Sequence, residues 1–301
     1  MLILKNPKIA VPVVLFAGLI WSFGPLVVRY MNDPQLIPWQ YIFGRGLTIF
    51  ILLNLYLFFE EGKEFYKNYF KIGISGLIGG SGLGVAMICF MFSITNTSAA
   101  ITLLCLAAMP FFTALLAFLF LREKITLNVW ISIIIATIGI SIMAIGTDNQ
   151  NTIVGFIFGI TSSVGFSVFS VSLRWRKETP KFTTTAFAGF FCVIFASIMI
   201  LTNDLVFFSS SYNSALFSLH GTLVCLGLIL YSIGSKAIPA AELTLLSLTE
   251  VIGGIFWVWL PLFGINEIPT NNTIIGGFFL FVSLTYYSLV MRWNKRYIGL
   301  N

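Results

Sequence analysis

Long apolar stretches follow one another along nearly the whole chain, with short connections between them. A helix needs about 20 mostly apolar residues to cross the hydrocarbon core of a bilayer. Only 9% of the residues are charged and 58% are hydrophobic, whereas about a quarter are charged in a typical soluble domain. We therefore predict an all-α integral membrane protein. Its ten predicted transmembrane helices are roughly residues 9–30, 37–58, 71–92, 98–120, 128–146, 152–173, 183–202, 213–234, 240–262 and 272–291.

The Lys and Arg residues are distributed unevenly among the predicted loops. If ten spans alternate from a cytoplasmic N-terminus, fifteen of the 17 basic residues lie on the cytoplasmic side, and the other two, Arg29 and Arg45, lie within spans. Loops on the cytoplasmic side of membrane proteins carry an excess of Lys and Arg. This pattern predicts a multi-pass protein of the cytoplasmic (inner) membrane with both termini in the cytoplasm. Because the cations lie at span ends, the pattern does not indicate nucleic-acid binding.

The two halves of the chain resemble each other when one is shifted by 141 residues. We therefore divide the single transmembrane domain into two five-helix repeats, residues 9–146 and 152–291. Because five is an odd number, the second repeat must enter the membrane from the opposite side. Inverted repeats of this kind are found in many secondary transporters, with the substrate site near the membrane midplane. The aligned positions include Gly18 with Gly159, Gly24 with Gly165, Gly80 with Gly221, and Ala99–Ala100 with Ala240–Ala241.

Segments 98–126 and 239–260 resemble the two repeats of the drug/metabolite transporter superfamily, in its EamA-type family. The recurring features of the family are small residues that open the fourth span of each repeat, a proline or a Glu-Pro pair in mid-span, and an acid at the end of the helix. Val251 departs from the family pattern, in which a proline kinks the helix beside Glu250. The residues that carry the resemblance are Pro110 and Glu123 in the first repeat, Ala240, Ala241, Glu250 and Glu267 in the second, and also Trp21 and Arg45.

The resemblance covers roughly residues 10–290 and implies a fold and a function. It implies a ten-helix carrier that moves small metabolites, often amino acids and frequently as an exporter. Such a carrier takes a small-molecule substrate, is surrounded by membrane lipid, has protons as a candidate coupling ion and acts as a monomer or a homodimer. It implies no cofactor.

Glu250 is the strongest candidate for a functional residue. On a helix that starts near Ala240, it lies about 15 Å deep, near the membrane midplane. An ionisable residue at that depth indicates a functional site. Ser247, Glu250 and Trp257 recur at helical spacing, so on a continuous helix they share a face. That face can bind a substrate ammonium group, or Glu250 can carry a proton. The alternative is a protonated Glu250 that is hydrogen-bonded within the bundle, and Glu242 is interpreted as a structural residue near a helix N-terminus.

Two other ionisable residues lie within predicted spans. Arg45 needs an anionic partner, and either a substrate carboxylate or Glu250 can provide one. His220, the single histidine, suits proton coupling because its usual pKa is near neutrality, although a lone histidine can also be a packing residue.

Hydroxyl and aromatic side chains complete the predicted substrate site. Ser163 and Ser167 recur at helical spacing and either line a polar cavity or hold helices together. Trp21 and Trp257 lie deep enough to contact an apolar part of a substrate, while other aromatic residues belong to interfacial belts.

The sequence contains no phosphate-binding loop, no metal-ligand cluster and no nucleophile motif. We therefore expect a protein that is not an enzyme and needs no metal. The leading hypothesis is a secondary transporter that works by alternating access. A passive channel is the main alternative, and an intramembrane enzyme is disfavoured because catalytic motifs are absent.

Overall fold

The structure, a computed structural model, describes the chain except for residues 1–6, 146–151, 177, 266–267, 269–270 and 298–301. Every regular element in the described residues is helical, which confirms the predicted all-α class. Eight helical stretches are long and apolar enough to cross a membrane, and each coincides with a predicted span. These are Ile9–Arg29, Pro38–Glu64, Gly73–Asn96, Ala99–Leu121, Ile153–Trp175, Lys181–Thr202, Ser211–Gly234 and Ala240–Trp259.

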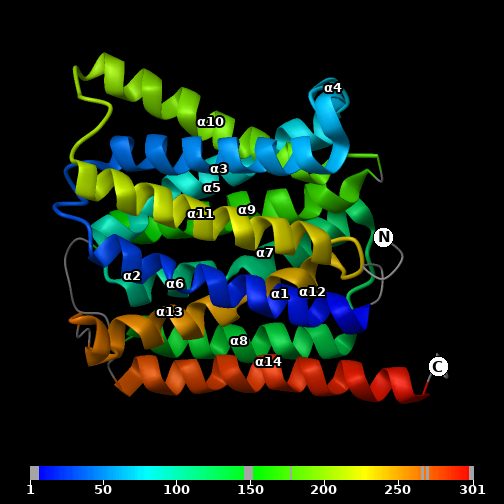
Figure 1. The fold of residues 1–301 in the computed structure, drawn as a ribbon. Helices are drawn as coiled ribbons and strands as arrows, with labels where there is room; N and C mark the ends of the chain where they lie inside the picture. The colour runs from blue at the N-terminus through cyan, green and yellow to red at the C-terminus, as the bar shows by residue number, and fades with distance from the viewer. Residues whose placement is uncertain (1–6, 146–151, 177, 266–267, 269–270, 298–301) are drawn as a thin grey trace.

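The helices lie side by side as a bundle (Figure 1). Three short helical turns, η2 (Gly62–Glu64), η3 (Ala117–Leu121) and η4 (Pro261–Phe263), extend or follow longer helices. The α-helices are α1 (Pro7–Trp21), α2 (Gly24–Arg29), α3 (Pro38–Glu61), α4 (Lys67–Phe70), α5 (Gly73–Asn96), α6 (Ala99–Leu106), α7 (Met109–Leu116), α8 (Leu127–Ile145), α9 (Thr152–Trp175), α10 (Lys181–Thr202), α11 (Ser211–Gly234), α12 (Ala240–Ser247), α13 (Thr249–Trp259) and α14 (Asn271–Tyr297).

Helices α8 and α14 lie at the positions of the fifth and tenth predicted spans and pack against each other. The Ser283 hydroxyl donates to the Ser132 carbonyl at 2.7 Å, and the Tyr286 hydroxyl donates to Asn128 Oδ1 at 3.2 Å. Their described apolar stretches, 127–139 and 274–287, are shorter than those of the other eight spans. The total of ten spans therefore stays a prediction, and residue 146, at the end of the first predicted repeat, lies outside the described residues.

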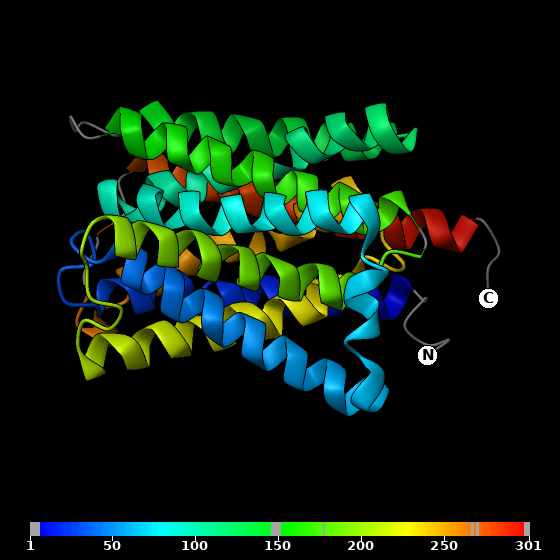
Figure 2. The same ribbon diagram turned by 90° about the horizontal axis from the view of Figure 1, so that it is seen from above.

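Helices at equivalent positions of the two halves pack against each other and run antiparallel. On α3 and α10, Gly46 lies against Cys192 at one end of the contact, and the Tyr56 and Phe182 rings are 5.1 Å apart at the other. Helices α8 and α14 are antiparallel in the same way. The pairs α5 with α9 and α1 with α11 also join the two halves. In Figures 1 and 2 the start of α1 and the end of α14 lie at the same end of the bundle.

In three of the spans the α-helix is interrupted by a turn of one or two residues, which we call a bend. The first span bends between α1 and α2, the fourth between α6 and α7, and the ninth between α12 and α13. Pro25 and Pro110 lie at the starts of α2 and α7, where proline is tolerated because the N–H that it lacks needs no helical partner. The bend at Ala107 and the bend at Leu248 are 141 positions apart, which is the shift that aligns the two halves.

The bend at Leu248 forms without a proline. The Ser247 hydroxyl donates to the Thr244 carbonyl at 2.8 Å, and the Thr249 hydroxyl donates to the Leu246 carbonyl at 3.2 Å. Hydroxyl groups that donate hydrogen bonds to backbone carbonyls in this way compete with the helical N–H donors and often bend helices. At the bend, Leu248 N–H therefore bonds three residues back, to the Leu245 carbonyl at 3.2 Å. Although Val251 replaces the family's proline, the ninth helix is interrupted at Leu248.

Candidate functional site

A cavity lies between helices of the first half (α1, α3, α5, α6 and α7) and of the second half (α9, α11 and α13). Most of its wall is apolar, and its charged lining residues in the described part of the chain are Arg45 and Glu250. The bends in the first, fourth and ninth spans lie beside it. Eight lining residues form four pairs whose members are 141 positions apart in the sequence: Trp21 with Ser162, Leu83 with Val224, Met87 with Leu228, and Met109 with Glu250.

Arg45 is a buried cation whose hydrogen-bonding capacity is only partly used. Its side chain is 3% exposed. Nη2 donates to the Met87 carbonyl at 2.6 Å and Nη1 donates to the Tyr41 hydroxyl at 3.1 Å, whereas Nε has no hydrogen-bond partner. The guanidinium also lies over the Tyr41 ring, 4.9 Å from its centroid, and 5.9 Å from that of Phe90. None of these partners carries a negative charge, so the cation lacks the anion that a buried charge needs.

Glu250 lies in the first turn of α13, directly after the bend at Leu248. Its side chain is partly buried and lines the cavity. Within the described part of the chain, it makes no hydrogen bond and no ion pair, including none with Arg45. The described residues therefore do not show a Glu250 that is hydrogen-bonded within the bundle. Glu242, in contrast, accepts a hydrogen bond from the Tyr287 hydroxyl near the start of α12 and does not line the cavity.

His220 and Trp21 are also brought to the cavity. His220 is 3% exposed, and its Nδ1 atom is hydrogen-bonded to the Tyr41 hydroxyl. The Trp21 indole N–H donates to the Val224 carbonyl at 3.2 Å, and its ring packs edge-to-face with Phe166, with centroids 5.7 Å apart. An aromatic ring whose polar atom is satisfied by the backbone presents an apolar face to the cavity.

The structure does not bring the other four predicted residues to the cavity wall. Ser163 donates to the Cys105 carbonyl at 2.5 Å and Ser167 to the Met109 carbonyl at 3.1 Å, so these hydroxyls join α9 to the bent fourth span. The Ser247 hydroxyl donates to the Thr244 carbonyl at the bend. Trp257 stacks on Phe23 at 4.6 Å and donates to the Ser22 hydroxyl at 2.8 Å, so it packs against the bend of the first span and not on the cavity wall.

Besides apolar lining residues, sequence reasoning missed two polar residues of this site. Ser162 lines the cavity and donates to the Ala86 carbonyl at 2.8 Å. Ser162 aligns with Trp21 when the two halves are shifted by 141 residues, and this alignment could have predicted it as a lining residue. Tyr41, which links Arg45 to His220, gave no signal, because its role depends on a contact between residues 179 positions apart.

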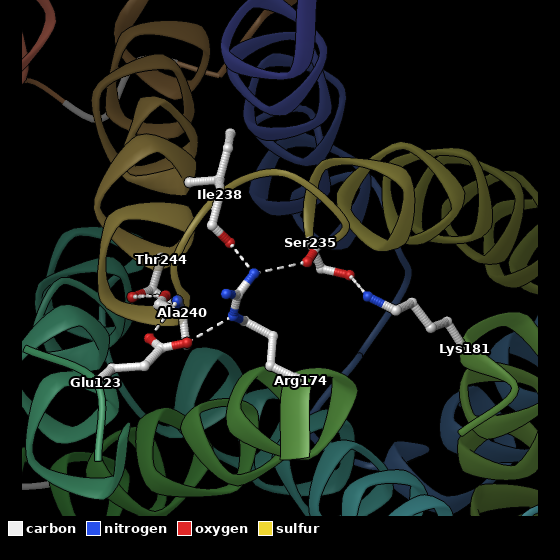
Figure 3. Close-up of polar contacts among 7 residues, drawn as sticks. All are labelled: Glu123, Arg174, Lys181, Ser235, Ile238, Ala240 and Thr244. Atoms are coloured by element: carbon white, nitrogen blue, oxygen red, sulfur yellow. Dashed lines mark hydrogen bonds and ion pairs between the residues drawn. The ribbon is translucent and has the colours of Figure 1, made fainter. Parts of the chain in front are cut away.

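A polar network joins the two halves at the end of the bundle where α1 begins (Figures 1 and 3). Arg174, at the end of α9, donates through Nε to Glu123 Oε1 at 2.7 Å, and through Nη1 to the carbonyls of Ser235 and Ile238 at 3.0 and 2.8 Å. The other oxygen of Glu123 accepts from the N–H of Ala240, the first residue of α12, at 3.3 Å. Glu123, from the first half, thus caps a helix of the second half, where a negative charge is favourable. In the same network, Lys181 Nζ donates to the Ser235 hydroxyl at 2.8 Å, and Thr244 donates to the Ala240 carbonyl at 3.3 Å.

Different polar contacts join the halves at the other end. Asn32 and Asn213 exchange two hydrogen bonds: the Asn32 N–H donates to the Asn213 side chain at 3.0 Å, and the Asn213 amide donates to the Asn32 carbonyl at 3.1 Å. The Tyr212 hydroxyl donates to the Tyr30 carbonyl at 3.1 Å, and the Tyr30 hydroxyl donates to the Phe263 carbonyl. These are uncharged contacts, whereas the network around Glu123 contains an ion pair.

A multi-pass helical bundle with a partly charged cavity between its halves is typical of membrane transporters. Residues 8–145 match the model of the EamA-like transporter family, the family that the sequence resembles. Among the described residues, no three His, Cys, Asp or Glu side chains gather as they would around a metal ion.

Two curated proteins from two Helicobacter pylori strains, each named an uncharacterized transporter, are 28% and 27% identical to the chain over 171 residues. These matches cover 56% of this chain and 56% of each relative, so the aligned region spans little more than half of either protein. A solved crystal structure has a similar fold over 95% of this chain and 99% of its own, with a TM-score of 0.72 and 17% sequence identity. The family and the relatives point to a membrane transporter and not to an enzyme.

Proposed function

We propose that the protein is a secondary transporter that moves a small metabolite through the central cavity by alternating access. The observation that carries the proposal is the cavity wall, in which residues 141 positions apart, one from each half, contribute in pairs. A site between two equivalent halves can open to either side of the membrane when the halves exchange conformations.

The antiparallel packing of equivalent helices supports the inverted repeat that this mechanism requires. Two repeats related by an axis in the membrane plane must have their corresponding helices running in opposite directions. The pairs α3 with α10 and α8 with α14 have this arrangement. We accordingly propose the ten-span inverted-repeat architecture, with repeats 9–146 and 152–291.

The charges in the cavity favour a zwitterionic substrate such as an amino acid. Among the described residues, Arg45 has a free Nε donor and no anionic partner, so a substrate carboxylate fits there. Glu250 has no hydrogen-bond partner in the described residues, so an ammonium group fits beside it. The apolar wall, including Trp21, would contact the remainder of the substrate. Glu250 is also the candidate proton carrier, because it is the one carboxyl group among the described lining residues.

The contacts at the two ends are candidate gates. Transport through the cavity requires each end to open in turn. We propose that the network of Glu123 and Arg174 closes one end and that the contacts of Asn32 and Asn213 close the other. By the distribution of Lys and Arg, the end with the Glu123 network faces the cytoplasm of a cell whose inner membrane holds the protein. The family resemblance favours export.

A two-step experiment tests the proposal. The purified protein is first screened by thermal shift against amino acids and other small zwitterions, since a ligand that binds the folded state at about 100 times its Kd stabilises it by about 2.7 kcal/mol. The ligands found are then tested for counterflow in proteoliposomes. A carrier accelerates entry of labelled substrate when unlabelled substrate is present inside, whereas a passive channel does not. If a ligand stabilises the protein but shows no counterflow, the carrier mechanism is wrong. If no zwitterion stabilises it, the substrate class is wrong.

A further inference from the structure

His220 is connected to the cavity cation through a single hydroxyl group. The Tyr41 hydroxyl is hydrogen-bonded to His220 Nδ1 and also accepts a hydrogen bond from Arg45 Nη1 at 3.1 Å. The three side chains are between 0% and 3% exposed. Because they are shielded from bulk water, the directions of these hydrogen bonds follow from the donors that the three groups possess.

The donors favour one assignment of protons. A guanidinium group can only donate, so the Tyr41 oxygen is the acceptor of the Arg45 bond. The Tyr41 hydroxyl has one proton, and its other hydrogen bond is to His220. If Nδ1–H donated instead, the Tyr41 oxygen would accept both bonds and its buried proton would have no partner among the described residues, so we assign that proton to the bond with Nδ1. An Nδ1 atom that accepts carries no proton, and the imidazole must then hold its single proton on Nε2. The backbone of Gly24 lies against Nε2, where an added Cβ would come within 2.7 Å.

We infer that His220 is a neutral positioning residue, which holds Tyr41 and thereby orients Arg45 toward the substrate, and that it is not a proton carrier. The role of Arg45 rests on the proposed function, whereas the protonation of His220 does not. A second proton on the ring would occupy Nδ1 and would leave the Tyr41 proton without its acceptor. It would also place a second positive charge beside Arg45 in a buried site, which is unfavourable.

The described groups around His220 give no compensating negative charge. Tyr41 and Arg45 come from α3, Gly24 from α2 and Phe90 from α5. Glu250 on α13 lines the same cavity, but it is hydrogen-bonded to none of them. Any proton coupling in this cavity is therefore assigned to Glu250 alone.

The inference can be tested on the purified protein without a substrate. The chain has one histidine, so a sample labelled with ¹⁵N-histidine and purified through a tag without histidine gives one imidazole spectrum. We expect the Nε2–H tautomer, unchanged between about pH 5 and about pH 8, the interval in which a free histidine titrates. A spectrum of the Nδ1–H tautomer, or of an imidazolium in this interval, would overturn the inference.

A Tyr41→Phe variant supplies the matched comparison. It keeps the ring that packs on Phe217, with centroids 5.5 Å apart, and removes only the hydroxyl. The single tautomer should then give way to a mixture or to a titrating ring, and an unchanged spectrum would contradict the role given to Tyr41. If this variant does not fold, the wild-type spectrum still decides the protonation of His220.

A transport measurement separates positioning from proton transfer once a substrate is known. Asparagine places an oxygen close to the position of Nδ1 and cannot titrate, so His220→Asn should retain transport and its response to a pH gradient. His220→Leu cannot accept the Tyr41 hydrogen bond, and we expect about tenfold weaker substrate binding. Loss of the pH response in His220→Asn would overturn the inference. Absence of transport in the wild type would instead refute the proposed function and leave the spectroscopic result standing.

Discussion

Replacing Glu123 by glutamine tests the proposed gate most simply. Glutamine keeps the shape of the side chain and one oxygen acceptor, but it removes the charge opposite Arg174 and at the start of α12. Hydrogen bonds to charged groups contribute about 1.5–3 kcal/mol. Because the two side chains are 26% and 21% exposed, we take the lower part of this range, about 2 kcal/mol. That loss changes the ratio of closed to open protein at this end about 30-fold, since about 1.4 kcal/mol corresponds to a factor of ten.

The population of the open form can be measured with a cysteine in the cavity. Val224 is partly exposed to the cavity, and cysteine is close to valine in size. A small membrane-impermeant methanethiosulfonate, added at the side of the Glu123 network, should label Val224→Cys about ten to 30 times faster when Glu123→Gln is also present. The unsubstituted protein gives the background, because its four native cysteines are buried: Cys89, Cys105, Cys192 and Cys225.

A second, exposed ion pair provides the control. Glu64 and Lys67 form an exposed pair at 2.6 Å three residues apart in the chain, and exposed pairs contribute little. Glu64→Gln makes the same chemical change outside the proposed gate and should leave the labelling rate unchanged. If Glu123→Gln labels no faster than Glu64→Gln, the network does not act as a gate.

Three further predictions concern packing and the cavity. Gly165→Val should lower thermal stability by about 1–3 kcal/mol, because even a Cβ at this position would lie 2.6 Å from the Gly82 carbonyl oxygen; an unchanged unfolding temperature would contradict the close packing of α5 on α9. Glu250→Gln should abolish transport driven by a pH gradient and leave substrate exchange intact. As the control, Glu242→Gln should respond to the gradient like the wild type. Equal responses in both variants and the wild type would exclude Glu250 as the proton carrier. Arg45→Lys should raise the half-saturation concentration of a carboxylate substrate about tenfold, because lysine cannot reproduce the planar donor geometry, and an unchanged value would remove Arg45 from substrate binding.

Much of the fold could be predicted because a bilayer constrains sequence strongly. Long apolar stretches and the distribution of cations identified eight spans that the described structure contains. The bend at Leu248 could not be predicted from the residues, because Ser and Thr hydroxyls bond to backbone carbonyls in straight helices as well. Thr202, for example, makes such bonds at 2.9 and 3.3 Å near the end of α10.

The candidate site was less predictable, because one helical position changes the direction of a side chain by about 100°. Ser162 faces the cavity, whereas its neighbour Ser163 donates a hydrogen bond to the Cys105 carbonyl in the fourth span. Sequence spacing places both on the same helix and does not say which neighbour each one meets. Glu250 and Arg45 were identifiable because an ionisable residue in a membrane span requires a reason, whichever way it points. Glu267, which the resemblance also used, lies outside the described residues.

Labelling of Val224→Cys from both sides of the membrane tests alternating access most directly. In oriented membranes, the rate is measured with the reagent on one side at a time, with and without Glu123→Gln. If the two halves open in turn, the substitution must lower the rate from the side of Asn32 and Asn213 as it raises the rate from its own side, because the two open forms share one population. A higher labelling rate from one side with an unchanged labelling rate from the other would indicate a continuous pore and contradict the carrier mechanism.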